Sequence, residues 1–312
     1  MERLLITGGL GHIGSKLIHS IEPGQFDEIM IVDNLATMRY SSLFNLPNGI
    51  NYRFFDEDIL EIDFNKLLES IDVVIHLAAI TDATNSFHIK DQIKAVNYLG
   101  TKKLAEACIT QDVRLIFPST TSVYGQQSEM VDEDCNQKNL NPQSPYAYYK
   151  LKSEKMLMNM GANQNLKFII CRFGTIFGKS IGMRFHTAVN KFCWQAAMGH
   201  PLTVWETALN QKRPYLGVKD AISAIKFIIE NNIFNNQIYN IVSVNNTVSD
   251  IIKIIKPIIP DLKINFTKAE VMNQLSYEVD SNKIKACGFI ASDSMDIGIK
   301  ETIDLLSNRN PS

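Results

Sequence analysis

Tyr146 and Lys150 lie four residues apart in the segment Tyr146-Ala147-Tyr148-Tyr149-Lys150. On a helix, positions i and i+4 share one face, so the phenol and the ammonium would point into the same space. A free phenol has a pKa near ~10 and is a poor base at neutral pH. A neighbouring positive charge favours the phenolate and lowers that pKa, so the pair could take a proton from a substrate hydroxyl. The same spacing also occurs by chance on many helices, where the two residues form only a half-buried face.

A glycine-rich segment near the start of the chain has the spacing of a dinucleotide-binding turn. Gly8, Gly11 and Gly14 follow an apolar run and precede a helical pattern. Such a turn must be sharp, approach a pyrophosphate closely and bring the helix onto the sheet, and each requirement excludes a Cβ atom at one position. The first helix would then present free N–H groups to the phosphates. The alternative is an ordinary tight turn.

Two acidic residues support the dinucleotide interpretation. Asp33 ends the second apolar run and stands where a carboxylate binds the adenosine ribose hydroxyls. Asp58, followed by Ile59, comes after the third run and could accept a hydrogen bond from the adenine amino group. A carboxylate at Asp33 would repel a 2′-phosphate, and the nearest following arginine, Arg39, is not adjacent to it. The sequence therefore predicts NAD as the cofactor.

Strand and helix patterns alternate through the first half of the chain. Continuous apolar runs separated by helices are typical of a parallel sheet that is covered on both faces. The sequence therefore predicts an α/β fold with a Rossmann-type, doubly wound parallel sheet. Helices are expected at about 91–110 and around Tyr146. The expected strands are residues 4–7, 29–32, 52–55, 73–77, 114–117 and 168–171.

The later part of the chain is less regular and predicts a smaller domain. A chain of 312 residues is near the upper limit of what one hydrophobic core serves. We expect a Rossmann domain of residues 1–178 plus about 213–244, and a smaller, substrate-binding domain of about 179–212 and 245–312. The smaller domain should contain a helix and a polar, tryptophan-containing loop within 180–209, a helix at 249–255, a short strand near Ile264 and a terminal helix.

Composition excludes several function classes. The net charge of −2 provides no basic excess for binding nucleic acid or an anionic membrane surface. No apolar run reaches membrane-spanning length, and the chain enters a strand too early for a signal peptide. The five cysteines form no CxxC pair and are expected as buried residues in a reducing compartment, without disulfides or metal. We therefore expect a cytoplasmic protein.

A series of motifs occurs in one order along nearly the whole chain. They are TGGLGHIG, IVDNL, DEDI, VVIHLAA, AVNYLGT, FPSTTSVYG, SPYAYYK, CRFGTIFG, KRPYLGVKD and YNIVS. In this order and spacing the chain resembles the extended short-chain dehydrogenase/reductase family, in its NAD-dependent nucleotide-sugar epimerase/dehydratase branch.

The resemblance implies a role for each chemically important residue. Thr120 would hydrogen-bond the reacting sugar hydroxyl, Tyr146 would be the general base, and Lys150 would hold the nicotinamide ribose and tune the tyrosine. Arg213 matches an arginine that clamps the diphosphate of a nucleotide sugar, a task that suits a planar guanidinium. Its alternative is a surface ion pair with Asp220.

The predicted binding residues form two sets. The cofactor set is Gly8, Gly11, His12, Ile13, Gly14, Asp33, Asn34, Asp58, Ile59, Leu77, Ala78, Ala79, Asn97, Tyr146 and Lys150. The substrate set is Thr81, Ser86, Thr121, Thr175, Lys191, Trp205 and Arg213. Trp205 could stack on a base or sugar, or pack within the smaller domain. His186 and His200 are expected to have no role.

Departures from the family pattern reduce the number of reactions that the chain could catalyse. The family's dehydratases have an Asp-Glu pair after the catalytic threonine, because removing water needs a further acid and base. Thr121 and Ser122 stand there in this chain and cannot do that work at neutral pH, so 4,6-dehydration is disfavoured.

Other departures fall in the phosphate-binding segments. Thr175 stands where the family usually has Asn, and Lys179 where Pro is common. The second phosphate-binding arginine is absent from residues 269–277, which offer Asn273 and Gln274 instead. Lys179, Arg184 or Lys191 could replace the lost contacts, although exposure to solvent is the simpler expectation for each.

The leading hypothesis is an enzyme that oxidises a hydroxyl, expected at C4, of a nucleotide-activated sugar. It would act as an epimerase or a net dehydrogenase, and the frequency of epimerases in the family favours the first. A non-catalytic NAD-binding regulator would show erosion of Thr120, Tyr146 and Lys150, which are all present. An enzyme on a non-nucleotide substrate is opposed by the polar loops and Arg213. By resemblance we expect a homodimer or homotetramer, formed through the helix at about 91–110 and the Tyr146 helix.

Overall fold

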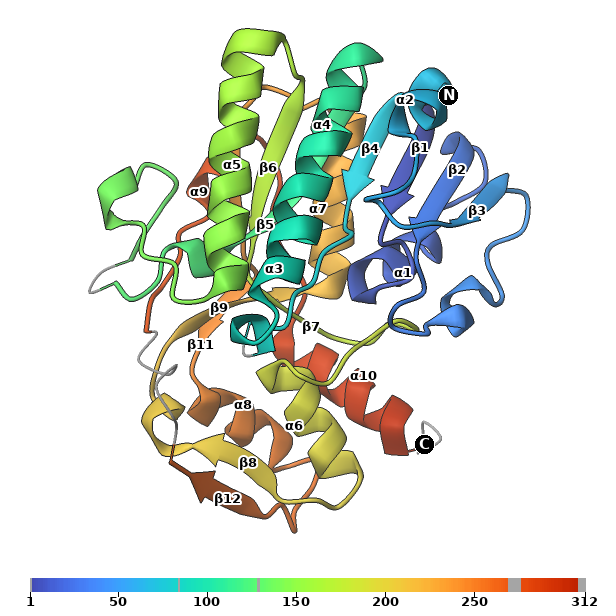
Figure 1. Cartoon of the computed structure of the whole chain (residues 1–312). Coiled ribbons are helices and arrows are strands. Elements are labelled where there is room, and N and C mark those ends of the chain that lie inside the picture. The colour runs from blue at the N-terminus through green and yellow to red at the C-terminus, as the bar shows by residue number, and fades with distance from the viewer. Residues whose placement is uncertain (1, 84, 128–129, 269–275, 308–312) are drawn as a thin grey trace.

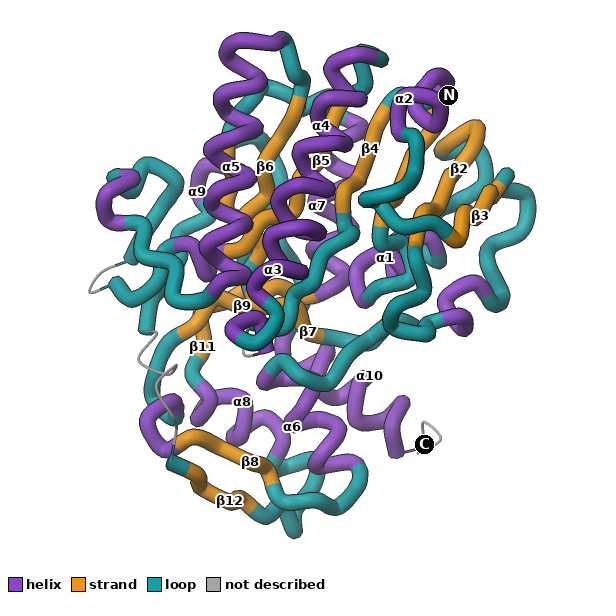
Figure 2. The backbone as a smooth tube through the Cα atoms, in the orientation of Figure 1, coloured by secondary structure: helices purple, strands orange, loops and turns teal. Residues whose placement is uncertain are grey.

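Seven parallel strands form the central sheet, in the order β10-β6-β5-β4-β1-β2-β3 (Figures 1 and 2). The computed structural model describes residues 2–83, 85–127, 130–268 and 276–307. The strands of this sheet are β1 (Glu2–Thr7), β2 (Phe26–Asp33), β3 (Tyr52–Asp56), β4 (Val73–His76), β5 (Arg114–Thr120), β6 (Phe168–Phe173) and β10 (Ile238–Ile241). The order of the strands reverses beside β1, and in open α/β sheets ligands bind at such a switch point, outside the carboxyl ends of the strands.

Helices cover both faces of the sheet because its strands are apolar on both sides. Along β1, Leu4 and Ile6 face one buried cluster and Leu5 the other. The first cluster packs against α1 (His12–Ile18) and α7 (Val218–Glu230). The second packs against α2 (Phe64–Leu67), α4 (Thr101–Thr110) and α5 (Pro145–Gln164). The predicted doubly wound parallel sheet is confirmed.

A separate apolar cluster lies below the carboxyl ends of the strands (Figure 1). It is built from α6 (Ala188–Ala197), α8 (Val248–Ile255), α10 (Met295–Ser307) and β8 (Leu202–Trp205). Strand β12 (Ile264–Thr267) pairs in parallel with β8 and is mostly exposed. A three-stranded sheet of β7 (Thr175–Phe177), β9 (Arg213–Gly217) and β11 (Val244–Asn246) lies between this cluster and the main sheet. The cavities described below are lined from both sides of this junction.

Short elements complete the described chain. They are α3 (Lys90–Ile93), α9 (Asn282–Ala286), a π-helix (Lys94–Gly100) and the 3-10 helices Tyr40–Leu43, Leu68–Ser70, Asn85–Phe87, Thr121–Val123, Gln137–Asn139 and Glu206–Ala208.

The helix expected at about 91–110 is confirmed; it runs without a break through α3, the π-helix and α4, with the widened turns confined to Lys94–Gly100. One element differs from the sequence predictions. The polar loop expected around Trp205 contains β8, which pairs with β12 about sixty residues later. The six predicted strands, the helix at 249–255, the strand near Ile264 and the terminal helix are confirmed.

Candidate active site

The glycine-rich loop between β1 and α1 lines a cavity of about 420 Å³, which we call the loop cavity. Gly8 has φ of +68°, and a Cβ atom there would lie 2.5 Å from the backbone nitrogen of Ala78. At Gly14 a Cβ atom would lie 2.5 Å from the carbonyl oxygen of Gly9. Both glycines are therefore required by backbone packing, and they leave open the space above the loop that a dinucleotide would need.

Acidic residues from the ends of β2 and β3 stand at the far side of the loop cavity. Asp33 accepts hydrogen bonds from the backbone N–H groups of Leu10 (3.1 Å) and Leu35 (3.0 Å), which fix its carboxylate. Burial raises the pKa of Asp33, and these two N–H groups oppose that shift. Asn34 donates to the Asp58 carboxylate at 2.8 Å. Each carboxylate keeps free lone pairs with which it can accept hydroxyl or amino hydrogens.

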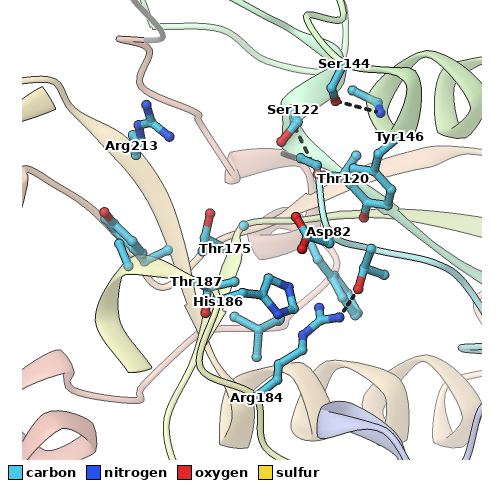
Figure 3. Close-up of a pocket in the computed structure, with 18 of the residues that line it drawn as sticks. Asp82, Thr120, Ser122, Ser144, Tyr146, Thr175, Arg184, His186, Thr187 and Arg213 are labelled. Carbon is cyan, nitrogen blue, oxygen red and sulfur yellow. Dashed lines mark hydrogen bonds between the residues drawn. The ribbon is translucent and has the colours of Figure 1, made fainter. Parts of the chain in front are cut away.

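A second cavity, of about 320 Å³, adjoins the first and contains the predicted reacting centre; we call it the tyrosine cavity (Figure 3). Helix α5 places Tyr146 in its first turn, because Pro145 begins the helix and the Ser144 hydroxyl caps it by accepting from the Ala147 N–H at 3.2 Å. Thr120, the last residue of β5, lines this cavity and opposes the rise that burial causes in the pKa of the Tyr146 phenol. Lys150 lines the same cavity one helical turn later.

Lys150 lies in an apolar environment that changes its titration. Its Nζ donates to the Pro118 carbonyl at 2.7 Å and lies 4.4 Å from the centroid of the Phe117 ring. Burial lowers the pKa of Lys150 to about 7, against the opposing charge of Glu154. An amine that titrates near neutral pH can exchange a proton during a reaction as well as provide charge.

The electrostatics of Tyr146 differ from the sequence expectation. Burial raises the pKa of the phenol, while the positive charge of Arg184 and the hydrogen bond with Thr120 lower it. We expected the Lys150 ammonium to lower this pKa, but its Nζ is bound to the Pro118 carbonyl. In the described structure Arg184 takes the place of Lys150 as the nearby positive charge.

His76, the last residue of β4, connects the end of β1 to the start of α4 beneath the cavities. The ring is fully buried, with Nδ1 2.7 Å from the Thr7 hydroxyl and Nε2 3.0 Å from the Thr101 hydroxyl. Burial and the charge of Lys150 lower the pKa of His76 to about 3. His76 is therefore a neutral residue that fixes the strand ends beneath the cavities.

We expect His76 to make the protein sensitive to acid. Its folded pKa of about 3 lies below the ordinary value of 6.5, so the stability it contributes is fully present above pH 6.5 and is lost as the pH falls toward 3. Each pH unit in that window costs about 1.4 kcal/mol. Urea unfolding at pH 7 and pH 5 should show a loss about 2 kcal/mol smaller in His76→Asn than in the wild type. His200→Asn is the control, because His200 is exposed and its replacement should leave the loss of stability between pH 7 and pH 5 the same as in the wild type. An equal loss in His76→Asn and the wild type would contradict this assignment.

The tyrosine cavity also contains most of the predicted substrate residues. Thr81, Thr175, Lys191, Trp205 and Arg213 all line it. Arg213 begins β9, and within the described residues its Nη2 is buried without a hydrogen-bond partner. The alternative ion pair of Arg213 with Asp220 is excluded, because the Asp220 carboxylate accepts instead from Ser243, Ser292 and Asp293. Trp205 is partly exposed and reaches the cavity from the end of β8.

Three predicted site residues line neither cavity. Ser86 is fully buried and donates to the Ala83 carbonyl at 2.6 Å, so its hydroxyl is used within its own turn. Thr121 is buried, with its hydroxyl 3.4 Å from that of Tyr277, and the neighbouring Ser122 lines the tyrosine cavity instead. The Asn97 amide bonds the backbone N–H and C=O of Ile80, both at 2.8 Å. Asn97 thus holds a loop that lines the loop cavity.

Two residues outside the predicted site sets line both cavities: Arg184, for which solvent exposure was the simpler expectation, and His186, for which no role was expected. Arg184 and His186 project from the loop between β7 and α6 to where the cavities meet (Figure 3). Lys179, also considered for phosphate binding, pairs with Glu301 at 3.6 Å instead. The segment 269–275, where a second arginine was sought, lies outside the described residues.

Neither a metal site nor a membrane span occurs among the residues that the structure describes. No group of three or more His, Cys, Asp or Glu side chains there is arranged to hold a metal ion. No described helix is both long and apolar enough to cross a bilayer.

Comparisons with known proteins place these features in a family. An uncharacterized UDP-glucose epimerase of Bacillus subtilis (strain 168), YtcB, is 29% identical over 239 residues, which are 73% of this chain and 72% of that protein. A trifunctional UDP-glucose 4,6-dehydratase/UDP-4-keto-6-deoxy-D-glucose 3,5-epimerase/UDP-4-keto-L-rhamnose-reductase of Arabidopsis thaliana is 30% identical over 97% of this chain. This chain spans about half, 47%, of the length of the plant protein.

A solved structure agrees with the fold over nearly the full length. The UDP-glucuronic acid 4-epimerase from Bacillus cereus, in complex with NAD, superposes with a TM-score of 0.86 at 27% identity and covers 98% of this chain and 99% of that one. The model of the NAD dependent epimerase/dehydratase family matches residues 4–242. That match spans the loop cavity and the residues Thr120, Tyr146 and Lys150, and the chain belongs to the NAD dependent epimerase/dehydratase family.

Proposed function

We propose that the protein is an NAD-dependent 4-epimerase of a nucleotide-activated sugar. The observation that carries the proposal is the convergence of Thr120, Tyr146 and Lys150, from two elements, in a cavity that adjoins the glycine-lined loop cavity. The names of the Bacillus relatives, a UDP-glucose epimerase and a UDP-glucuronic acid 4-epimerase, support this reaction.

The loop cavity suits NAD by its shape and its charges. Gly8 and Gly14 let the loop pack directly against the backbone of Ala78 and Gly9, where any Cβ atom would clash, and the tight turn that results lines the loop cavity. Asp33 and Asp58 would take the adenosine end through ribose and adenine hydrogens, and Asp33 would repel a 2′-phosphate. NAD, when bound, supplies the acceptor for a hydride from the sugar carbon.

The residues of the tyrosine cavity would accept the proton of the sugar hydroxyl and position the substrate. Tyr146 would accept that proton, and Thr120, which lines the same cavity, would hold the hydroxyl in position. Lys150 would supply positive charge beside the reacting atoms, and its pKa of about 7 lies near neutral pH. Arg213, Lys191 and Trp205 would hold the diphosphate and base at the far end of the cavity.

Dehydration is the weaker candidate on the chemistry of the side chains. Thr121 is buried against Tyr277, and Ser122 is the only residue of the two that lines the cavity. A serine hydroxyl is neither an acid nor a base at neutral pH, so Ser122 cannot assist the removal of water from the sugar.

A sugar deuterated at C4 distinguishes the reactions. With UDP-, dTDP-, GDP- and CDP-sugars in turn, we expect one substrate to give its C4 epimer with the deuterium still at C4, read by NMR and mass spectrometry. Reduced nicotinamide should not accumulate in the near-UV absorbance. Release of a keto sugar with labelled NADH would identify a net dehydrogenase, and a product lighter by one water would identify a dehydratase. Either result would overturn the epimerase assignment.

We also propose the arrangement of domains and subunits that the resemblance implies. Residues 1–178 plus about 213–244 would form the Rossmann domain, and about 179–212 and 245–312 the substrate-binding domain, in keeping with the separate cluster around α6, α8 and α10. A homodimer or homotetramer would form through the helices at residues 90–110 and α5, where Leu99 and Met158 are exposed.

A further inference from the structure

The segment Gly178 to Thr187 between β7 and α6, which we call the cover segment, is hydrogen-bonded to α1 and packs against the glycine-rich loop that precedes it. The imidazole Nε2 of His12 donates to the Gly178 carbonyl at 2.8 Å, and the Gly182 N–H donates to the Ser15 hydroxyl at 2.9 Å. A Cβ atom at Gly182 would lie 2.2 Å from the carbonyl oxygen of Leu10. The cover segment therefore crosses directly over the loop that forms the cofactor cradle.

One buried side chain fixes the position of Arg184 within the cover segment. The amide of Asn190, fully buried in α6, accepts from the Gly178 N–H at 3.1 Å and donates to the Arg184 carbonyl at 3.2 Å. Both bonds use one rigid amide group, so the segment between them has a defined path. Arg184 is thus held where the loop cavity and the tyrosine cavity meet.

The guanidinium of Arg184 has unused capacity for an anion. Its Nη1 donates to the Thr81 hydroxyl, and within the described part of the chain its buried Nε has no partner and no carboxylate forms an ion pair with it (Figure 3). Burial lowers the pKa of Arg184, although the Tyr146 and Asp82 oxygens oppose that shift. A buried guanidinium without an anion is costly, so its surroundings favour a ligand that brings negative charge.

We propose that Arg184 binds the diphosphate of the dinucleotide cofactor and closes the cradle from the side opposite the glycine-rich loop. This inference rests on the proposed function. The planar guanidinium of an arginine can bind two phosphate oxygens at once. The cover segment places this guanidinium opposite the glycine-rich loop, which would bind the same diphosphate. Arg213 and Lys191 line only the tyrosine cavity, so the substrate diphosphate has its own cations. Arg39 lines only the loop cavity and interacts with Asp33, at the adenosine end.

Calorimetry on nucleotide-free enzyme with NAD, ADP-ribose and UDP tests the proposal. ADP-ribose retains the cofactor diphosphate without the nicotinamide, and UDP represents the diphosphate of the substrate. Because a charge-assisted contact is lost, R184Q should bind both NAD and ADP-ribose at least about tenfold more weakly than the wild type, with UDP unchanged within about twofold. K179Q is the matched control, because it removes one positive charge from the same segment at a residue that lines neither cavity. Its affinity for all three ligands should stay within about twofold.

R184K provides a second measurement should R184Q fail to fold, as judged by circular dichroism. Lysine keeps the charge but loses the fork, so NAD and ADP-ribose should weaken about threefold or more. Unchanged NAD affinity in the arginine variants, or a loss confined to UDP, would overturn the proposal. If the wild type itself binds no NAD, the cofactor assignment of the proposed function fails instead, so the two failures are distinguishable.

Discussion

Replacement of Tyr146 with Phe is expected to lower kcat by a factor of about 10² to 10⁴, the usual contribution of a positioned general base. The substitution keeps the ring and removes only the hydroxyl that would take the proton from the sugar. Loss of one hydroxyl that faces the cavity should cost no more than roughly 1 kcal/mol of stability, so the variant should remain folded. The measurement is the rate of formation of the C4 epimer at saturating substrate, with NAD affinity as the check on binding.

Tyr148→Phe is the matched control for this prediction. Tyr148 belongs to the same five-residue segment, but its side chain is half exposed and packs edge-on against Tyr149, with the ring centroids 5.1 Å apart. Its loss of a hydroxyl should leave kcat within about twofold of the wild type. Equal losses in the Tyr146 and Tyr148 variants, or an active Tyr146→Phe enzyme, would show that another group takes the proton.

The contrast between these two tyrosines shows which part of the site the sequence could predict. Helical spacing alone placed Tyr146 and Lys150 on one face, and the glycine spacing placed the dinucleotide loop, because both patterns are local. Six of the seven strands of the main sheet were predictable for the same reason, since each is a largely apolar run. Strand β10 was not predicted, because Asn240 interrupts its short apolar pattern. Strand β8 was missed because it is short and its partner β12 is about sixty residues away.

The orientation of the remaining site residues depends on contacts between distant segments. Thr121 faces Tyr277 rather than the cavity, and nothing near Thr121 in the sequence indicates that contact. Exposure to solvent was the simpler expectation for Arg184, but Asn190 and Ser15 of α1 hold its segment at the junction of the cavities. Gly182 was the available signal, since a glycine can permit another segment of backbone to approach closely and so place a neighbouring charged residue such as Arg184 in a site. The sequence does not indicate which segment approaches.

A buried ion pair behind the reacting centre leads to the second large prediction. Glu154 and Arg172 are almost fully buried, and the carboxylate accepts from the guanidinium at 2.7 Å, 3.1 Å and 3.2 Å. The Ser119 hydroxyl donates to the same carboxylate at 2.5 Å, next to Thr120 in β5. Burial would lower the pKa of Arg172, but the charge of Glu154 and the hydrogen bonds with it outweigh that effect and raise the pKa.

Arg172→Met should therefore lower the free energy of unfolding by about 3–5 kcal/mol, because it leaves the Glu154 carboxylate buried without a cation. The double variant Glu154→Met/Arg172→Met removes both charges and should cost less than Arg172→Met alone. Urea denaturation measures all three proteins. The exposed pair Lys102–Glu106, at 3.6 Å, is the control, and replacing both of its residues with Ala should cost less than about 1 kcal/mol. A loss below about 1 kcal/mol in Arg172→Met, or a double variant less stable than the single one, would show that an unpaired Glu154 carboxylate is not what destabilises the protein.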